Sequence, residues 1–317
     1  MKYCYAFRRF SDYPYLGNAF DMDPERITSK FLSRVKDMGF DGIELGVECL
    51  EKINGGEKGI KEFAKKLEDH GTPLLALRSG GLMIDPKYGE DNYKRIISSF
   101  KFAEFFNTKL INGAISIPEK SPYLDTGTEL ISSEWVAHAG LPFSQNSSRE
   151  TTLPEYELLA KKYSEVCDVA KEFDISISCE VHQNSPVDNS WSAKLIHKLV
   201  NKDNFGINPD LGNILWNYDI PEELCEDAII ELAPISNYWH CKNLIRVNHP
   251  ENQRSVFIRE TIVGGEIDYR FAVEAMHDAN YDGFMSIEGV FGGDQYYSDK
   301  ISLEYCKNLW NCLLYTS

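Results

Sequence analysis

The feature that most constrains the fold is a repeated alternation of short strand-like runs with longer segments of helical periodicity. Eight runs are rich in Ile, Val, Leu or aromatic residues, which is typical of buried strands. They lie near residues 2–8, 42–47, 73–78, 108–114, 175–182, 205–210, 236–242 and 283–288. Amphipathic segments separate them, and in residues 24–38 the apolar side chains recur at helical spacing: Ile27, Phe31, Val35 and Met38.

Eight strand–helix units predict an α/β fold, a single (β/α)₈ TIM barrel formed by one domain over residues 1–317. Parallel strands need crossover helices, and closing the sheet removes both of its edges. The alternative is an open doubly wound sheet, but no Gly-x-Gly-x-x-Gly motif follows the first run to indicate nucleotide binding. The connection from about Ser116 to Thr152 is unusually long. We expect this loop after strand four to lie over the carboxyl-terminal mouth, where the active sites of such barrels form.

Charge and composition exclude several classes of partner. The 317 residues include 33 Lys+Arg and 49 Asp+Glu, a formal net charge of −16, which opposes binding to nucleic acid or to an anionic membrane. The eight cysteines form no Cys-x-x-Cys pair, as expected of reduced thiols. No apolar run is long enough to span a bilayer, and the first residues lack the apolar core of a secretion signal. The sequence therefore predicts a cytoplasmic protein.

Four successive predicted strands end in side chains that divalent cations favour: Glu180, Asp210, His240 and Glu288. Because the carboxyl ends of barrel strands meet at one mouth, these side chains should converge there. Three carboxylates and one imidazole suit one divalent cation such as Mn²⁺, Mg²⁺, Co²⁺ or Zn²⁺. A single strand-end carboxylate is more often a helix cap or a surface group. The repetition of the pattern in four units is what predicts a metal site.

A cation at this position predicts the enolisation of a carbonyl substrate. Binding the carbonyl oxygen to a divalent cation stabilises a developing enediolate by several kcal/mol. A positioned base then adds roughly 10²- to 10⁴-fold in rate. His182 lies two residues after Glu180, so both side chains point to the same face of the strand. We predict His182 as a general base; the alternative is a histidine that orients a metal ligand.

Three further side chains are candidates for substrate binding. Lys242 lies two residues after His240 and either binds a substrate oxygen or neutralises the carboxylates. His138 lies in the long connection, where it either reaches the substrate or is simply solvated. Trp191 lies near the predicted mouth, where it would suit a substrate with a flat apolar part. No Gly-rich phosphate cradle or arginine cluster indicates a phosphate ester.

Six segments in order, GFDGIELGVE, ISCEVH, NPDLGN, WHCKNL, VGGEIDY and NYDGFMSIEG, make the chain resemble the xylose isomerase-like family of sugar isomerases and epimerases. The resemblance implies a metal-dependent barrel that acts on keto-sugars, with a metal quartet at Glu180, Asp210, His240 and Glu288. In the epimerases of that family the first and last Glu also exchange protons with the substrate, which gives Glu180 and Glu288 a catalytic role. The usual His-x-Lys-Asp here ends in Asn243, and the usual Gly-x-Gly turn reads Gly264-Gly265-Glu266.

Within the family, the long fourth loop, the Glu-Val-His segment and the chain length look most like the large (alpha) subunit of C-glycoside deglycosidases. That resemblance implies Mn²⁺, a small β-rich (beta) partner subunit in a hetero-oligomer, and cleavage of the C–C bond between a 3-oxo sugar and its aglycone. The alternatives are a sugar or sugar-phosphate isomerase or ketose 3-epimerase of the same fold, and a non-catalytic metal-binding barrel subunit. A metal-dependent endonuclease would need more histidine ligands and a basic groove, which the charge of −16 opposes.

Overall fold

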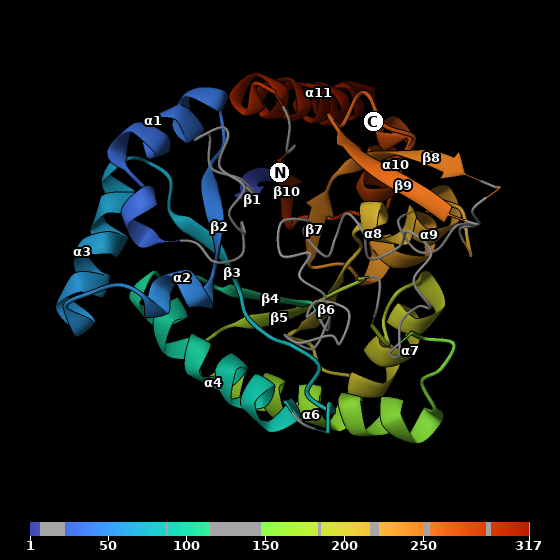
Figure 1. The fold of residues 1–317 in the computed structure, drawn as a ribbon, viewed down its shortest axis with the longest axis horizontal. Coiled ribbons are helices and arrows are strands. Elements are labelled where there is room, and N and C mark those ends of the chain that lie inside the picture. The colour runs from blue at the N-terminus through green and yellow to red at the C-terminus, as the bar shows by residue number, and fades with distance from the viewer. Residues whose placement is uncertain are drawn as a thin grey trace.

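Eight parallel strands form the wall of a barrel (Figure 1). The computed structural model describes residues 1–6, 23–86, 88–114, 147–182, 185–215, 222–249, 251, 254–289 and 293–316. The barrel strands are β1 (Lys2–Ala6), β2 (Gly42–Gly46), β3 (Leu74–Arg78), β4 (Leu110–Ala114), β5 (Ser176–Glu180), β6 (Phe205–Asn208), β7 (Tyr238–Cys241) and β10 (Phe284–Glu288). Their order is β6-β5-β4-β3-β2-β1-β10-β7, and a parallel bridge from Ile207 to Ser236 links the two ends. The predicted TIM barrel is confirmed.

Helices cover the outside of this barrel (Figure 1). They are α1 (Ser29–Met38), α2 (Val47–Glu51), α3 (Gly56–Asp69), α4 (Gly89–Phe105), α6 (Leu153–Glu172), α7 (Ser190–Val200), α8 (Leu211–Leu215), α9 (Cys225–Leu232), α10 (Tyr269–Asp278) and α11 (Gln295–Thr316). Two short 3₁₀ helices span Pro24–Arg26 and Ala233–Ile235. The last helix, α11, lies between α10 and α1, so the end of the chain completes the ring of helices (Figure 1).

The alternation of side chains along each strand separates an apolar outer layer from a polar interior. On β7, Trp239 points outward, is fully buried and stacks on Tyr269 with ring centroids 6.1 Å apart. Its neighbours Tyr238 and His240 have the opposite orientation and bond to Glu44 inside the barrel. The same period of two places Glu180 of β5 and Glu288 of β10 on the inner face. The strands thus bury apolar area under the helices while directing ionisable groups inward.

The connection after β7 contains an antiparallel hairpin that the sequence analysis did not predict. Its strands are β8 (Asn243–His249) and β9 (Arg254–Glu260), paired from Asn243 opposite Glu260 to His249 opposite Arg254. One face of the hairpin packs inward through Leu244 and Phe257, which are buried. The hairpin accounts for the wide gap between the last two predicted metal ligands. Residues 7–8 of the first predicted strand and residues 115–146 of the long fourth connection lie outside the described residues.

Candidate metal centre

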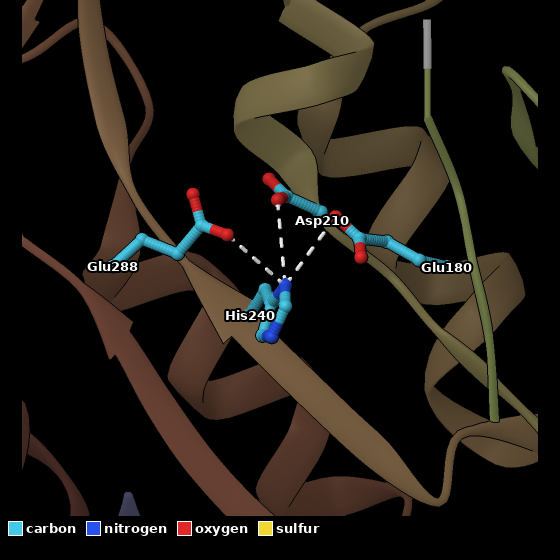
Figure 2. Close-up of side chains that lie close together, drawn as sticks. All are labelled: Glu180, Asp210, His240 and Glu288. Carbon is cyan, nitrogen blue, oxygen red and sulfur yellow. Dashed lines mark ion pairs between the residues drawn. The ribbon is translucent and has the colours of Figure 1, made fainter. Parts of the chain in front are cut away.

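The four predicted metal ligands converge at one point inside the mouth of the barrel (Figure 2). Each offers one ligand atom, and these atoms all lie within 4.8 Å of one another. Glu180 and Glu288 are the last residues of β5 and β10, His240 lies within β7, and Asp210 follows β6 directly before α8. All four are at most 5% exposed. The convergence expected from four strand ends is therefore present in the fold.

His240 presents one ring nitrogen to the three carboxylates. Its Nδ1 lies 3.2 Å from Glu288 Oε1, 3.3 Å from Glu180 Oε1 and 3.9 Å from Asp210 Oδ2 (Figure 2). Among the residues that the structure describes, this buried nitrogen has no hydrogen-bond partner, although a buried polar atom without one is costly. A lone pair directed among three carboxylate oxygens is the arrangement that a divalent cation satisfies. The buried Glu, Asp and His side chains therefore fit a divalent metal site.

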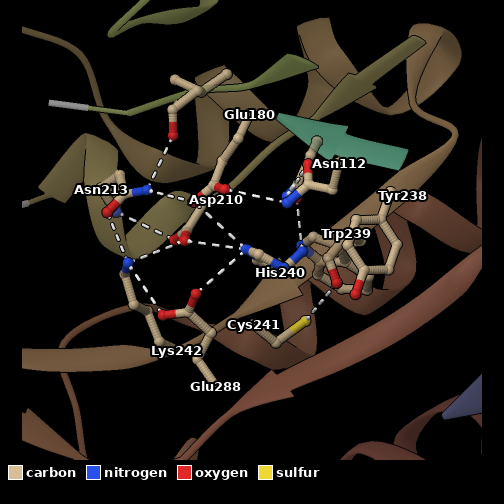
Figure 3. Close-up of polar contacts among 12 residues, drawn as sticks. Asn112, Glu180, Asp210, Asn213, Tyr238, Trp239, His240, Cys241, Lys242 and Glu288 are labelled. Atoms are coloured by element: carbon tan, nitrogen blue, oxygen red, sulfur yellow. Dashed lines mark hydrogen bonds and ion pairs between the residues drawn. The ribbon is translucent and has the colours of Figure 1, made fainter. Parts of the chain in front are cut away.

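Two cationic side chains contact these carboxylates, and Figure 3 shows the contacts of one of them, Lys242. Lys242 Nζ lies 3.0 Å from Asp210 Oδ2 and 3.2 Å from Glu288 Oε2. Arg259 of β9 donates from NH1 to the same Glu288 Oε2 at 3.1 Å. Both cations are buried, so solvent screens these pairs little. Glu288 thus has Oε1 directed at the ligand cluster and Oε2 held by two positive charges.

Asparagine side chains fix the orientation of the Glu180 carboxylate (Figure 3). Asn112 of β4 donates to Glu180 Oε2, and Asn213 of α8 donates to Glu180 Oε1, each at 3.1 Å. Asn208 donates to Asn112 Oδ1 at 3.2 Å, which leaves the amide nitrogen of Asn112 to face Glu180. Asn213 Oδ1 accepts a 2.6 Å hydrogen bond from Lys242. A network that crosses four strands therefore holds the carboxylates in place before any cation binds.

The segment NPDLGN shows why this local sequence suits the site. Asp210 supplies a carboxylate and Asn213 bridges Glu180 and Lys242. A Cβ on Gly212 would come within 2.3 Å of Lys242 Cγ. The glycine therefore gives Lys242 room to reach the cluster.

Burial and mutual charge shift the pKa values of these groups. Burial raises the pKa of Asp210 to about 6 against the opposing effect of Lys242, with Glu288 and Glu180 adding to the rise. Burial lowers the pKa of His240, but the carboxylates of Glu44 and Glu180 outweigh it and raise that pKa to about 10. Burial also raises the pKa of Glu180, yet the neighbouring His240 more than compensates and holds it below its usual range. A proton on His240 and a divalent cation thus compete for the same position among the carboxylates.

The predicted catalytic and substrate-binding residues lie in different settings. His182 is buried near Glu180, close enough that its charge favours ionisation of that carboxylate. Lys242 lies within the carboxylate cluster. Trp191, in the first turn of α7, is 60% exposed and packs edge-on against Tyr156. His138 lies outside the described residues.

Sequence reasoning missed the residues that surround the ligands. Glu44 of β2 accepts from His240 Nε2 at 2.8 Å and is 1% exposed. A carboxylate between apolar Ile43 and Leu45 in a predicted strand was the available signal. Arg259 could not be found, because the hairpin that carries it was not predicted. Asn112 and Asn213 are uncharged, and nothing in their spacing distinguished them from other asparagines.

Comparisons with known proteins agree with the barrel fold. A magnesium-bound xylose isomerase-like TIM barrel protein from Mycobacterium smegmatis is 21% identical with a TM-score of 0.74, and the match covers 96% of each chain. The 3-keto-D-glucoside 4-epimerase of E. coli is 15% identical over 97% of this chain and 100% of its own, with a TM-score of 0.66. D-psicose 3-epimerase from Clostridium cellulolyticum H10 is 16% identical over 98% and 99%, with a TM-score of 0.65. At these identities the likeness establishes the fold.

Three further results bear on the assignment. No curated protein matches the sequence. Among the described residues, no helix has the length and apolar character needed to cross a membrane. The pattern of the xylose isomerase-like TIM barrel family matches residues 32–302, which include all four convergent ligands. The chain belongs to the xylose isomerase-like TIM barrel family.

Proposed function

We propose that the protein is a divalent-metal-dependent enzyme that enolises a keto-sugar. The observation that supports this most directly is His240 Nδ1, which is buried beside three carboxylates and has no hydrogen-bond partner within the described part of the chain. A cation held by Glu180, Asp210, His240 and Glu288 would polarise a substrate carbonyl. The proton on the adjacent carbon would then be more acidic and easier for a base to remove. Mn²⁺ is our first choice, with Mg²⁺, Co²⁺ and Zn²⁺ as alternatives; the magnesium in the M. smegmatis protein supports a hard divalent ion.

His182 is our proposed general base. It is buried beside Glu180, and an imidazole needs little adjustment of its pKa to accept a proton near neutral pH. The resemblance to the epimerases also implies that Glu180 and Glu288 exchange protons with the substrate. However, Arg259 and Lys242 hold the outer oxygen of Glu288, which lowers its basicity, and Asn112 and Asn213 donate to Glu180. These contacts favour His182 as base and leave the two glutamates to orient the substrate through the cation.

For the other candidate residues we propose supporting roles. Lys242 neutralises the carboxylates, in keeping with its contacts to Asp210 and Glu288. Trp191 offers an exposed indole face to a flat part of the substrate. His138 stays a predicted substrate contact of the long connection.

As substrate we propose a keto-sugar, which is a 3-oxo C-glycoside for a deglycosidase and a ketose or 3-oxo sugar for an isomerase or epimerase. In C-glycoside deglycosidation the base takes the C2 proton, and a C1–C2 double bond forms as the bond from C1 to the aglycone breaks. The electron pair of that bond goes to the aglycone carbon, which accepts a proton. In the alternative, an isomerase or epimerase, the proton returns to the enolised sugar. The likeness to a 3-keto-D-glucoside 4-epimerase and a D-psicose 3-epimerase favours this second candidate.

The lyase would require the small partner subunit that the sub-family resemblance implies. A non-catalytic barrel is our last alternative, and the intact set of four ligands speaks against it. We place the protein in the cytoplasm because none of its eight cysteines forms a disulfide and seven are buried, as suits a reducing compartment.

A panel of probes tests these assignments. Purified protein is loaded in turn with Mn²⁺, Mg²⁺, Co²⁺ and Zn²⁺ and incubated in D₂O with 3-oxo-glucose, methyl 3-oxo-glucoside, D-fructose, D-psicose and a 3-oxo-C-glucoside. Proton NMR reports exchange of the proton beside the carbonyl, and chromatography reports any released aglycone. Exchange that chelation abolishes and that His182→Gln slows at unchanged metal content supports the proposal. Failure to bind any of the four cations overturns it.

A further inference from the structure

Glu44 of β2 is a carboxylate inside the barrel that is not one of the four candidate ligands but contacts one of them, His240. It is 1% exposed, and burying a charge is costly unless partners compensate for the lost hydration. Its Oε2 accepts from Tyr238 OH at 2.9 Å and from His240 Nε2 at 2.8 Å. Its Oε1 lies 3.7 Å from Arg78 NH1. Glu44 therefore joins a cationic side chain at the end of β3 to the ring of a metal ligand on β7.

The bond from Glu44 determines which nitrogen of His240 carries a proton. A carboxylate only accepts, so the 2.8 Å contact requires a hydrogen on Nε2. In a neutral imidazole the other nitrogen, Nδ1, then holds the lone pair, and Nδ1 is the atom that faces Glu180, Asp210 and Glu288. The backbone N–H of His240 also donates to Asn208 Oδ1 at 2.7 Å, which fixes the strand behind the ring.

We propose that Glu44 is a positioning residue of the metal centre, which holds His240 as the Nε2–H tautomer and directs the Nδ1 lone pair at the cation. Tyr238 and the nearby Arg78 hold Glu44 in the orientation that this role needs. The proposal rests on the proposed function, because it concerns a cation bound by the four ligands. It adds a fourth acidic residue, from the opposite side of the barrel, to the residues that set metal affinity.

A structural role alone would make different demands on Glu44. If it served only to pair Arg78 and Tyr238 in the barrel interior, its loss would lower the stability of the fold and leave the tautomer of His240 unchanged. Tyr238→Phe is the matched control, because it removes one hydrogen bond to the same Glu44 oxygen but keeps the aromatic ring that packs against His240. Glu44→Gln keeps the size of the side chain but replaces the charged, acceptor-only carboxylate with a neutral amide, so the Nε2–H tautomer is no longer enforced.

The experiment uses the full chain and measures binding rather than turnover. Calorimetry gives the Kd of Mn²⁺ for the wild type, Glu44→Gln and Tyr238→Phe, with circular dichroism as a check of folding. We expect Glu44→Gln to weaken Mn²⁺ binding by about 10- to 100-fold, the usual effect of losing a partner behind a metal-bound histidine. Tyr238→Phe should change it by less than about threefold, since the carboxylate and its bond to His240 persist.

A second measurement keeps the proposal testable if the Glu44 variant does not fold. Nitrogen-15 NMR of the Zn²⁺-loaded wild type should show one histidine with the metal on Nδ1 and a slowly exchanging proton on Nε2. A proton on Nδ1, or an unchanged Mn²⁺ affinity in folded Glu44→Gln, overturns the proposal. A wild type that binds neither Mn²⁺ nor Zn²⁺ refutes the metal site itself and with it the proposed function, which separates that failure from a failure of the role of Glu44.

Discussion

The two halves of the barrel contribute differently to the candidate site. The half that contains β5, β6, β7 and β10 supplies all four convergent ligands. The half that contains β1 to β4 supplies Glu44, Arg78 and Asn112, and of these Glu44 and Asn112 contact a ligand from behind. The four candidate ligands therefore come from one half, together with Asn213, Lys242 and Arg259 that contact them, whereas the other half contributes orienting groups.

The two halves also differ in the net charge of these groups. Among the groups of the ligand half described above, three carboxylates face two cationic side chains, Lys242 and Arg259, so one negative charge is unbalanced when His240 is neutral. In the other half, Glu44 lies beside Arg78. A divalent cation reverses the sign of the first half and leaves the second unchanged. The resulting positive charge would attract the negative charge that develops on an enolised substrate.

The comparison predicts that loss of a ligand is far more damaging than loss of a supporting residue. Asp210→Ala should abolish metal retention, because the remaining carboxylates are already engaged by Lys242, Arg259 and asparagines. Asn112→Ala, which removes one hydrogen bond to Glu180, should weaken binding only about tenfold. Calorimetry with Mn²⁺ measures both variants. Equal losses in the two variants would contradict the division between the halves.

A second prediction concerns Lys242, a positively charged side chain that already lies among the carboxylates of the ligand half. Lys242→Met should lower the free energy of unfolding of the metal-free protein by about 3 kcal/mol, because it leaves buried carboxylates without a partner. Saturating Mn²⁺ should recover much of this loss, since it supplies the missing positive charge. Urea unfolding with and without Mn²⁺ measures the effect. Lys194→Met, which breaks an exposed pair with Glu231, is the control and should cost less than about 1 kcal/mol in either condition.

A third prediction follows from the raised pKa of His240. Because that pKa is about 10 in the metal-free protein, a proton competes with the metal, and affinity should rise about tenfold per pH unit from pH 7 to 9 and level off above 10. Below pH 6 the rise should be steeper, since Asp210, with a pKa of about 6, also binds a proton there. Without metal the same shift at His240 stabilises the fold fully below about pH 6.5, and this contribution is lost as pH rises through 10.

Calorimetry in two buffers of different ionisation enthalpy checks the third prediction. Near pH 8 it should detect about one proton released for each Mn²⁺ bound. An affinity that is constant between pH 7 and 9 would show that His240 is neutral before the metal arrives.

The four ligands could be predicted from the sequence, and most of the residues that contact them could not. Glu180, Asp210, His240 and Glu288 each follow an apolar strand, and parallel strands bring their ends together whatever the details of packing. Glu44 lies in the middle of its strand, so its partner depends on which strand faces it across the interior. Arg259 reaches Glu288 only because β8 and β9 fold back over the mouth, a tertiary arrangement that local periodicity does not encode.

The smallest expected effect comes from a helix cap in the ligand half, whose loss should lower the stability of the fold but not the affinity for metal. Asp268 begins α10, where its side chain accepts from the backbone N–H groups of Arg270 and Phe271 at 2.9 and 3.1 Å. Asp268→Ala should lower the free energy of unfolding by about 1 kcal/mol through loss of this cap. Its Mn²⁺ affinity should match the wild type, because the cap touches none of the four ligands. Urea unfolding and calorimetry on the same sample give both values. A drop in affinity here would mean that metal binding follows overall stability, and the contrast between the two halves would then reflect stability and not separate roles.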